Sequence, residues 1–203
     1  MNPKDYEKNV LITESKDFAV VKNRVDDRMI RLLHAGLGLS SEMEELVDAV
    51  VDPGSRELDW VNISEEGGDL LWYVGFAVNA FGFDHDEISS EESGVEKYVE
   101  KYSRDCALAA ISGLTLGVGK YNDILKKHLM YGREIDTALT KRTLTGICCA
   151  VSGLAIVCGT TIEKLRETNI EKLKARYGDK FTEAAALNRD LETERKILEN
   201  GAK

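Results

Sequence analysis

Two pairs of acidic residues stand close together in the first half of the chain, with the spacing E-x-x-E and E-x-x-D. The first pair is Glu42 and Glu45, and the second is Glu66 and Asp69. Residues three apart share one face of a helix, so each pair would point its two carboxylates in the same direction. If the two helices pack together, four carboxylates converge and repel one another. A hard divalent cation with oxygen ligands, of which Mg2+ is the usual one, would relieve this repulsion.

The surroundings of the pairs favour a functional site over a solvated acidic helix face, although the spacing alone leaves both interpretations open. The flanking residues are largely apolar: Leu46, Val47, Val50, Leu70, Leu71, Trp72 and Val74. Gly67 and Gly68 weaken the second helix by about 1 kcal/mol each relative to Ala, and residues this small let another backbone or a ligand come close. Pro53 and Gly54 predict a turn between two antiparallel helices.

Composition describes an ordinary globular protein without a basic surface. The 203 residues suffice for one domain with a sizeable core or for two small ones, and 43% are hydrophobic and 31% charged. A net charge of -9 disfavours binding to nucleic acid or to an anionic membrane. The four cysteines, Cys106, Cys148, Cys149 and Cys158, lie in apolar stretches without C-x-x-C spacing. We expect buried, reduced thiols in a cytoplasmic protein.

The periodicity predicts an all-α helical bundle, and no strand-like alternation is present. Helices are expected over about 4–12, 26–50, 62–81, 95–130, 138–158, 160 through the KLKARY motif, and 180–199. Asn62 with Glu65, and Thr160 with Glu163, have the spacing of capping boxes. Residues 143–162 carry no charge, but Gly, Ser, Thr and Cys dilute them, so we expect a buried core helix rather than a membrane span. The N-terminus has no apolar stretch typical of a signal peptide.

An internal repeat with a constant offset of 77 positions (36 to 113) links the two halves of the chain. The matched residues are Gly36 with Gly113, Leu37 with Leu114, Leu39 with Leu116, the run 56–59 with the run 133–136, Val74 with Val151, and Gly82 with Gly159. The acidic residues are lost at the same offset, where Gly119, Asn122, Thr143 and Gly146 stand. A constant offset without gaps indicates duplication, and the second copy cannot hold the same metal ions.

Four strings resemble a known family: LLHAGLGLSSEMEEL, DWVNISEEGGDLLWYV, TNIEKLKARYGDKF and ALNRDLETERKILE. They resemble the MazG-like all-α nucleoside triphosphate pyrophosphohydrolases, and are closest to the short phage and bacterial type. The family hallmark of E-x-x-E followed by E-x-x-D is met by the two acidic pairs. The C-terminal pattern N-x-x-K-L-x-x-R-Y is met at Asn169, Lys172, Leu173, Arg176 and Tyr177. The resemblance covers roughly residues 4–88 and 160–199.

The resemblance implies a reaction in which a nucleoside triphosphate and water give a nucleoside monophosphate and pyrophosphate. It implies that Glu42, Glu45, Glu66 and Asp69 ligate Mg2+, with Mn2+ as a second candidate, and Glu42 is our choice for the carboxylate that orients or deprotonates the attacking water. It further implies that Asn169, Lys172, Arg176 and Tyr177 contact phosphates or close the site. Trp72 or Trp60 would stack on a base if either is not simply a core residue. Asn188, Arg189 and Asp190 match the family tail without a chemical role that we can derive.

The domain organisation that we predict is one all-α domain over 1–203. It comprises an active helical pair (26–88), a degenerate second copy (100–165) and C-terminal helices (166–203). The second copy would make an intrachain pseudo-dimer, and a homo-oligomer of such chains is compatible with it. Lys120, Lys141 or Arg142 of this copy would lend charge to a phosphate tail, unless they are surface residues.

Other classes fit less well. A di-iron bundle needs E-x-x-H, and none of His34, His85 and His128 has Glu three residues before it. Gly119 and Lys120 do not complete a Walker motif, because Leu stands at 114 and Tyr at 121. Two alternatives stay open: a base-specific dUTPase or dCTPase of the same superfamily, and a non-catalytic helical protein that binds a nucleotide or a partner.

Overall fold

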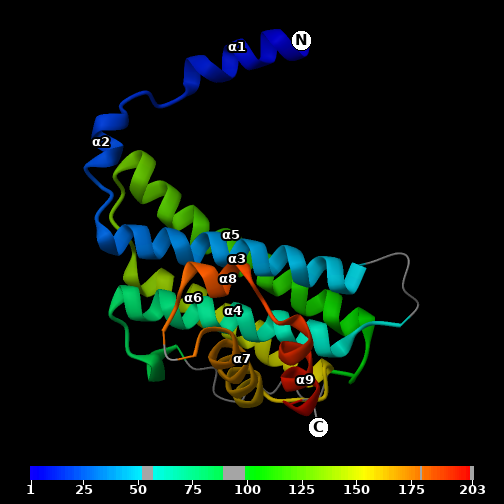
Figure 1. Ribbon diagram of the computed structural model, residues 1–203. Helices are drawn as coiled ribbons and strands as arrows, with labels where there is room; N and C mark the ends of the chain where they lie inside the picture. The colour runs from blue at the N-terminus through cyan, green and yellow to red at the C-terminus, as the bar shows by residue number, and fades with distance from the viewer. Residues whose placement is uncertain (52–56, 89–98, 179, 202–203) are drawn as a thin grey trace.

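The computed structural model describes residues 1–51, 57–88, 99–178 and 180–201, and all regular structure in these ranges is helical (Figure 1). The helices are α1 (Pro3–Thr13), α2 (Phe18–Lys22), α3 (Asp27–Val51), α4 (Trp60–Phe81), the short 3-10 helix η1 (His85–Glu87), α5 (Arg104–Tyr131), α6 (Thr137–Val157), α7 (Ile162–Tyr177), α8 (Glu183–Leu187) and α9 (Leu191–Gly201). The all-α prediction is therefore confirmed.

Helices α3, α4, α5 and α6 form a four-helix bundle around one hydrophobic core. Helix α3 packs on α4 and α5 on α6, while α3 also contacts α5 and α4 contacts α6. The pairing of α3 with α4 is antiparallel, since Arg28 near the start of α3 donates a hydrogen bond to the carbonyl of Ala80 near the end of α4. The hydroxyl of the buried Tyr121 on α5 donates to the carbonyl of Leu32 on α3, at 3.1 Å, and ties the two hairpins together.

The two hairpins begin and end at equivalent positions. Helices α4 and α6 are N-capped by Asp59 and Asp136, which are 77 positions apart, and both side chains accept hydrogen bonds from the first turn. Gly82 and Gly159 follow the C-terminal ends of α4 and α6, are again 77 positions apart, and have φ of +70° and +75°. Such values are readily adopted only by glycine, so both chain reversals depend on it.

Helix α7 crosses the bundle on the outer side of α4, where two glycines make room for it. A Cβ atom on Gly67 would lie 3.2 Å from Leu165, and one on Gly68 would lie 3.2 Å from the Cβ of Asn169 and 3.3 Å from the carbonyl of Leu165. The expectation that a glycine here admits another backbone is confirmed for Gly68, and that backbone belongs to α7, whereas Gly67 makes room for side chains. Helix α9 in turn packs on α7.

Several expected helix boundaries are wrong. Helix α4 is capped by Asp59 and not by Asn62, which lies inside the first turn, because the Asp59 carboxylate already accepts from the backbone of Val61 and Asn62. Helix α7 is capped by Thr161 rather than Thr160. The single helix expected over 180–199 is split into α8 and α9.

Other expectations fall partly outside the described residues. These are the turn at Pro53 and Gly54, Arg56 of the repeat, and residues 95–98 of the helix expected over 95–130. The expected start of that helix is also wrong, because residues 99–103 are described and are not helical: α5 begins at Arg104, with Ser103 as its N-cap. Helices α1 and α2 extend away from the bundle (Figure 1).

The uncharged stretch 143–162 is mostly the buried helix α6. All four cysteines are free, but only Cys148 and Cys158 are buried, whereas Cys106 and Cys149 are partly exposed, so the expectation of buried thiols is right for two of the four. Among the described helices no single one is long and apolar enough to cross a membrane, although α6 and α7, bent by 90°, meet the criteria of length and composition together.

Candidate active site

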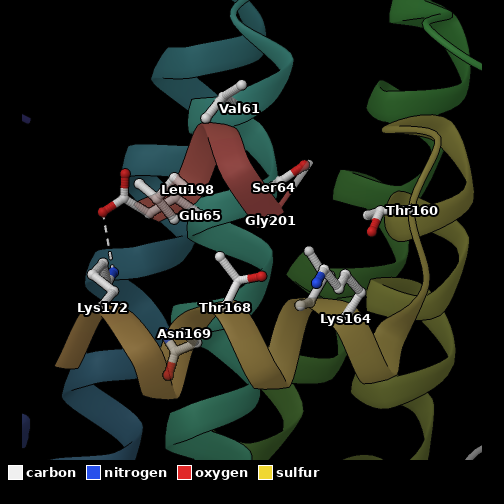
Figure 2. Close-up of a pocket in the computed structure, with 12 residues that line it drawn as sticks. Val61, Ser64, Glu65, Thr160, Lys164, Thr168, Asn169, Lys172, Leu198 and Gly201 are labelled. Atoms are coloured by element: carbon white, nitrogen blue, oxygen red, sulfur yellow. Dashed lines mark hydrogen bonds and ion pairs between the residues drawn. The ribbon is translucent and has the colours of Figure 1, made fainter. Parts of the chain in front are cut away.

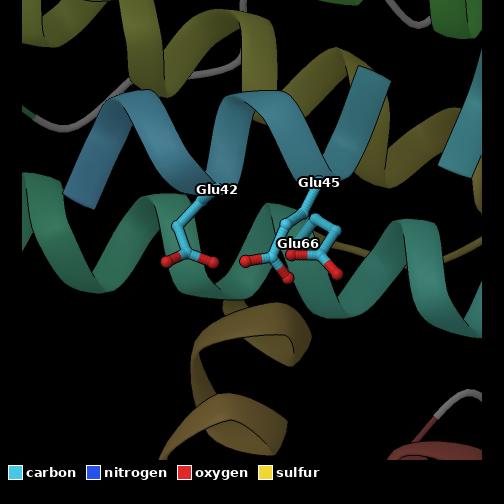
Figure 3. A group of neighbouring side chains, drawn as sticks. All are labelled: Glu42, Glu45 and Glu66. Carbon is cyan, nitrogen blue, oxygen red and sulfur yellow. The ribbon is translucent and has the colours of Figure 1, made fainter. Parts of the chain in front are cut away.

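Three carboxylates gather between the first two long helices. Helix α3 contributes Glu42 and Glu45, and helix α4 contributes Glu66 from the facing side (Figure 3). One oxygen atom from each carboxylate lies within 4.8 Å of the others. The spacing of E-x-x-E on α3 therefore places both side chains on the face that meets α4.

Glu66 is the most deeply placed of the three. It is only 5% exposed, and its buried Oε2 has no hydrogen-bond partner among the described residues. Burial, and then the negative charges of Asp69 and Glu45, raise the pKa of Glu66 to about 8. Burial and the same kind of neighbours, Asp69 and Glu45, raise the pKa of Glu42 to about 7. An oxygen-only donor set with one unpartnered oxygen fits a hard divalent cation, whose charge would offset this repulsion.

Asp69, the fourth predicted ligand, lies in the same cleft but is bound by protein donors. The Lys172 ammonium donates to both of its carboxylate oxygens at 2.8 and 2.6 Å, and Asn169 donates to one of them. Lys172 is 1% exposed and also donates to Glu65 at 3.1 Å. Although burial favours the neutral amine, Asp69 and Glu65 raise the pKa of Lys172, so its charge is retained. The predicted phosphate contacts Asn169 and Lys172 thus hold Asp69 in this structure.

The carboxylates open into a cleft of about 720 Å³ with an acidic side and a cationic side. The cationic side is formed by Lys174, Arg176, Lys180 and Arg189, and aromatic side chains of Trp72, Tyr73, Tyr177 and Phe181 also line the cleft. Trp72 is 37% exposed and stacks on Phe76, with ring centroids 5.4 Å apart. Trp60 lies elsewhere, against Tyr102, so of the two tryptophans Trp72 is the one beside the carboxylates.

Arg176 and Tyr177, the other predicted phosphate contacts, stand at the end of α7 and line the cleft. The guanidinium of Arg176 makes a two-pronged ion pair with Glu194, at 2.8 and 2.6 Å. The residues of the second copy that we considered as phosphate ligands, Lys120, Lys141 and Arg142, are not among the described residues that line the cleft. Lys141 is paired with Glu87 instead.

A second, much smaller cavity lies behind the Lys172–Glu65 ion pair, between α4, α7 and α9 (Figure 2). Its volume of about 20 Å³ has room for roughly one water molecule. The side chains of Ser64, Thr160 and Thr168 face it. It is too small for any ligand of nucleotide size.

Reasoning from the sequence missed several residues of this cleft. Glu65 accepts a hydrogen bond from Lys172, which also binds Asp69. The spacing motif selects Glu66, and nothing in the sequence indicates that the residue next to it also lies in the cleft. Glu194 and Arg189 belong to the C-terminal string of the resemblance, but their pairing depends on how α9 folds back. His34 lines the cleft and makes edge contacts with Tyr73 and Phe76.

This geometry defines a class: an all-helical bundle in which carboxylates of two antiparallel helices converge in an open cleft lined by charged and aromatic side chains. Residues 33–106 match the model of the MazG nucleotide pyrophosphohydrolase domain. The chain therefore contains a MazG domain, formed by most of α3, by α4 and η1, and by the first residues of α5. Members of this family are nucleoside triphosphate pyrophosphohydrolases, which places the protein among the hydrolases. No curated protein and no solved structure matches the chain.

Proposed function

We propose that the protein is a Mg2+-dependent pyrophosphohydrolase that converts a (deoxy)nucleoside triphosphate and water into the monophosphate and pyrophosphate. The observation that carries the metal site is the buried, unpartnered Oε2 of Glu66 beside two further carboxylates. Glu45 and Glu66 would hold the ion, with Asp69 adjacent to them, and Glu42 would instead act on the attacking water. Mg2+ is the first candidate because all donors are hard oxygens, and Mn2+ is the second.

The ion, when bound, would neutralise charge on the phosphate oxygens and polarise them. The protein side chains have the remaining tasks. Glu42 would orient the attacking water and accept its proton, and a carboxylate whose pKa is raised to about 7 is suited to that exchange near neutral pH. As water adds to the α-phosphorus, the bond from that phosphorus to the α–β bridging oxygen breaks, and pyrophosphate leaves.

The residues of α7 would have two tasks: to position a carboxylate of the site and to contact the triphosphate. Lys172 and Asn169 hold Asp69 in place, because their donors already satisfy its oxygens. Arg176 and Tyr177 line the cationic side of the cleft, where a triphosphate tail would lie. Trp72, which lines the cleft, offers a stacking surface for a base, although stacking accepts any base. A base-specific dUTPase or dCTPase is the alternative that the substrate panel below distinguishes.

We also propose that the α5–α6 hairpin is a degenerate second copy of α3–α4, which makes the chain a pseudo-dimer with one active site. The support lies in the shared offset of 77 positions at the first residue of each helix, at the N-caps Asp59 and Asp136 and at the glycines Gly82 and Gly159. The packing of α3 on α5 and of α4 on α6 is the arrangement that two copies related by a twofold axis would have. The second hairpin would cover the apolar face that the first cannot bury alone.

The test is pyrophosphate release from a panel of nucleoside and deoxynucleoside triphosphates with Mg2+. Glu45→Gln and Asp69→Asn should reduce release at least about 100-fold, as expected when charged groups of the reacting centre are neutralised. Glu44→Gln is the matched control, since Glu44 is exposed on α3 and lies outside the cluster. The preferred substrate would identify any base specificity. If no nucleotide is hydrolysed while Mg2+-dependent nucleotide binding persists, the protein is the helical binding protein considered above.

A further inference from the structure

A single buried carboxylate gathers two arginines at the cationic side of the cleft. Glu194 on α9 is 3% exposed and accepts hydrogen bonds from Arg176 through Nε and Nη2, and from Arg189 through the same two nitrogens. Burial alone would raise the pKa of Glu194, but the bonds from both arginines lower it to about 2. Glu194 is therefore charged at any ordinary pH and keeps the two guanidinium groups close together.

The position of this cluster relative to the carboxylates matters for its role. Arg176 comes from the end of α7 and Arg189 from the link between α8 and α9, yet both line the same cleft as the acidic residues. Arg189 also lies 3.8 Å from Glu65, the residue that shares Lys172 with Asp69. The cationic cluster is thus connected to the carboxylate cluster through neighbouring ion pairs.

The charges of this cluster leave a net positive site. Within the group of Arg176, Arg189 and Glu194, two positive charges face one negative charge. Glu65, 3.8 Å from Arg189, is already paired with Lys172 at 3.1 Å, and Lys174 and Lys180 also line the cleft. A guanidinium has five N–H donors, and the bonds to Glu194 use two from each arginine, so the pair can serve Glu194 and still present donors to an anion. Forked donors of this kind suit phosphate oxygens.

We infer that Arg189 binds the diphosphate part of the ligand together with Arg176, and that Glu194 is a positioning residue that holds the two side chains in place. The inference rests on the proposed function for the cleft, and it adds the C-terminal segment α8–α9 to the site. The ligand chemistry is a magnesium-complexed diphosphate, whether it is the tail of a nucleotide or free pyrophosphate.

A purely structural role is the competing explanation, because ion pairs also hold α9 to the rest of the protein. The chain contains a matched control for this. Arg195 on the same helix pairs with Asp59 at 2.7 Å and with Glu199 at 2.8 Å, but it does not line the cleft. Loss of Arg195 removes an anchor of α9 without touching the cationic side of the cleft.

The experiment is calorimetric titration of the full chain with inorganic pyrophosphate in excess Mg2+, for the wild type, Arg189→Gln, Arg189→Lys and Arg195→Gln. Arg189→Gln should weaken binding roughly 10- to 100-fold, the loss expected for a charge-assisted bond to phosphate. Arg189→Lys should recover part of the affinity, and Arg195→Gln should bind as the wild type does. Glu194→Gln should also weaken binding; if it fails to fold, Arg189→Gln decides the question.

Binding of pyrophosphate needs no turnover, so the result can be separated from that of the hydrolysis assay. If Arg189→Gln binds pyrophosphate like the wild type, or is weakened no more than Arg195→Gln, the inference is overturned even where hydrolysis is observed. It is also overturned if the wild type does not bind pyrophosphate. If the expected pattern appears in a protein that hydrolyses no nucleotide, the diphosphate site stands and the proposed reaction fails.

Discussion

Glu66 is the residue on which the proposed metal site depends most, because it is buried, acidic and incompletely hydrogen-bonded. In the metal-free protein its pKa is raised to about 8, whereas in the unfolded chain it titrates near its usual 4.5. Between these values the folded state binds the extra proton, so the free energy of unfolding falls as pH rises from 4.5 to 8. Below 4.5 the group is protonated in both states and contributes no slope.

This predicts a specific pH dependence of stability. In the presence of a chelator, thermal unfolding should shift to lower temperature between pH 5 and pH 8, and Glu66→Gln should flatten that dependence, because glutamine does not titrate. Glu42, whose pKa is raised to about 7, leaves a residual slope. Equal slopes for the two proteins would show that Glu66 titrates normally.

Added Mg2+ should act in the opposite direction. Because the ion competes with protons for the carboxylates, its stabilising effect should be larger at pH 8 than at pH 6. The shift of the unfolding temperature on addition of Mg2+ measures this, with Glu66→Gln as the variant in which the shift should shrink. A shift that is independent of both pH and Glu66 would place the bound ion elsewhere.

Lys172 is a second buried ionisable residue, and its charge has to be compensated by neighbouring carboxylates. Its ammonium is 1% exposed and compensates Asp69 and Glu65. Lys172→Met should destabilise the protein by about 3 kcal/mol, since the two carboxylates would lose their buried partner. Denaturant unfolding measures the loss, and the double variant with Asp69→Asn should regain part of it. Unchanged stability in Lys172→Met would mean that water already compensates these charges.

At the scale of elements, the contact between α4 and α7 positions the site. A Cβ atom added to Gly68 would lie 3.2 Å from the Cβ of Asn169 and 3.3 Å from the carbonyl oxygen of Leu165. A Cβ atom added to Gly75 on the same helix would meet no atom within 4 Å. Gly75→Ala should therefore stabilise the protein by up to about 1 kcal/mol through helix propensity. Gly68→Ala should lose that gain and lower turnover, because α7 and Asn169 must shift away from Asp69. Equal stabilisation by the two substitutions in denaturant unfolding would contradict the tight contact.

The elements also show what a sequence can and cannot predict. Periodicity predicted which segments are helical, and for α3, α4, α6 and α7 the predicted first and last residues lie within two positions of the observed ones. The caps were misassigned because several polar residues stand near each helix start, and only the folded backbone decides between Asp59 and Asn62. The break at 188–190 was missed because no Pro or Gly marks it.

The site was predictable to a similar degree. The spacing E-x-x-E and E-x-x-D placed Glu42, Glu45 and Glu66 on facing helices, and the structure brings them together. Spacing does not specify hydrogen-bond partners, so it did not indicate that Asp69 is bound by Lys172 and Asn169. The Glu194 cluster joins α7 to α9 across a chain reversal, which local patterns do not encode.

At the scale of the molecule, the pseudo-dimer proposal predicts that one chain is sufficient for function. The second hairpin already covers the first, and contacts such as Tyr121 to Leu32 lie within the chain. Specific activity should therefore stay constant as the protein is diluted through the range in which sedimentation shows only monomer. A loss of activity that follows dissociation would mean that another copy completes the site.

The measurement that tests the central claim most directly is the phosphorus NMR spectrum of a nucleoside triphosphate incubated with the protein and Mg2+. The wild type and Glu44→Gln should produce nucleoside monophosphate and pyrophosphate in equal amounts, and Glu66→Gln should produce neither at a comparable rate. Formation of nucleoside diphosphate and orthophosphate would contradict the proposed bond cleavage. Full activity in Glu66→Gln would contradict the role of the buried carboxylate cluster.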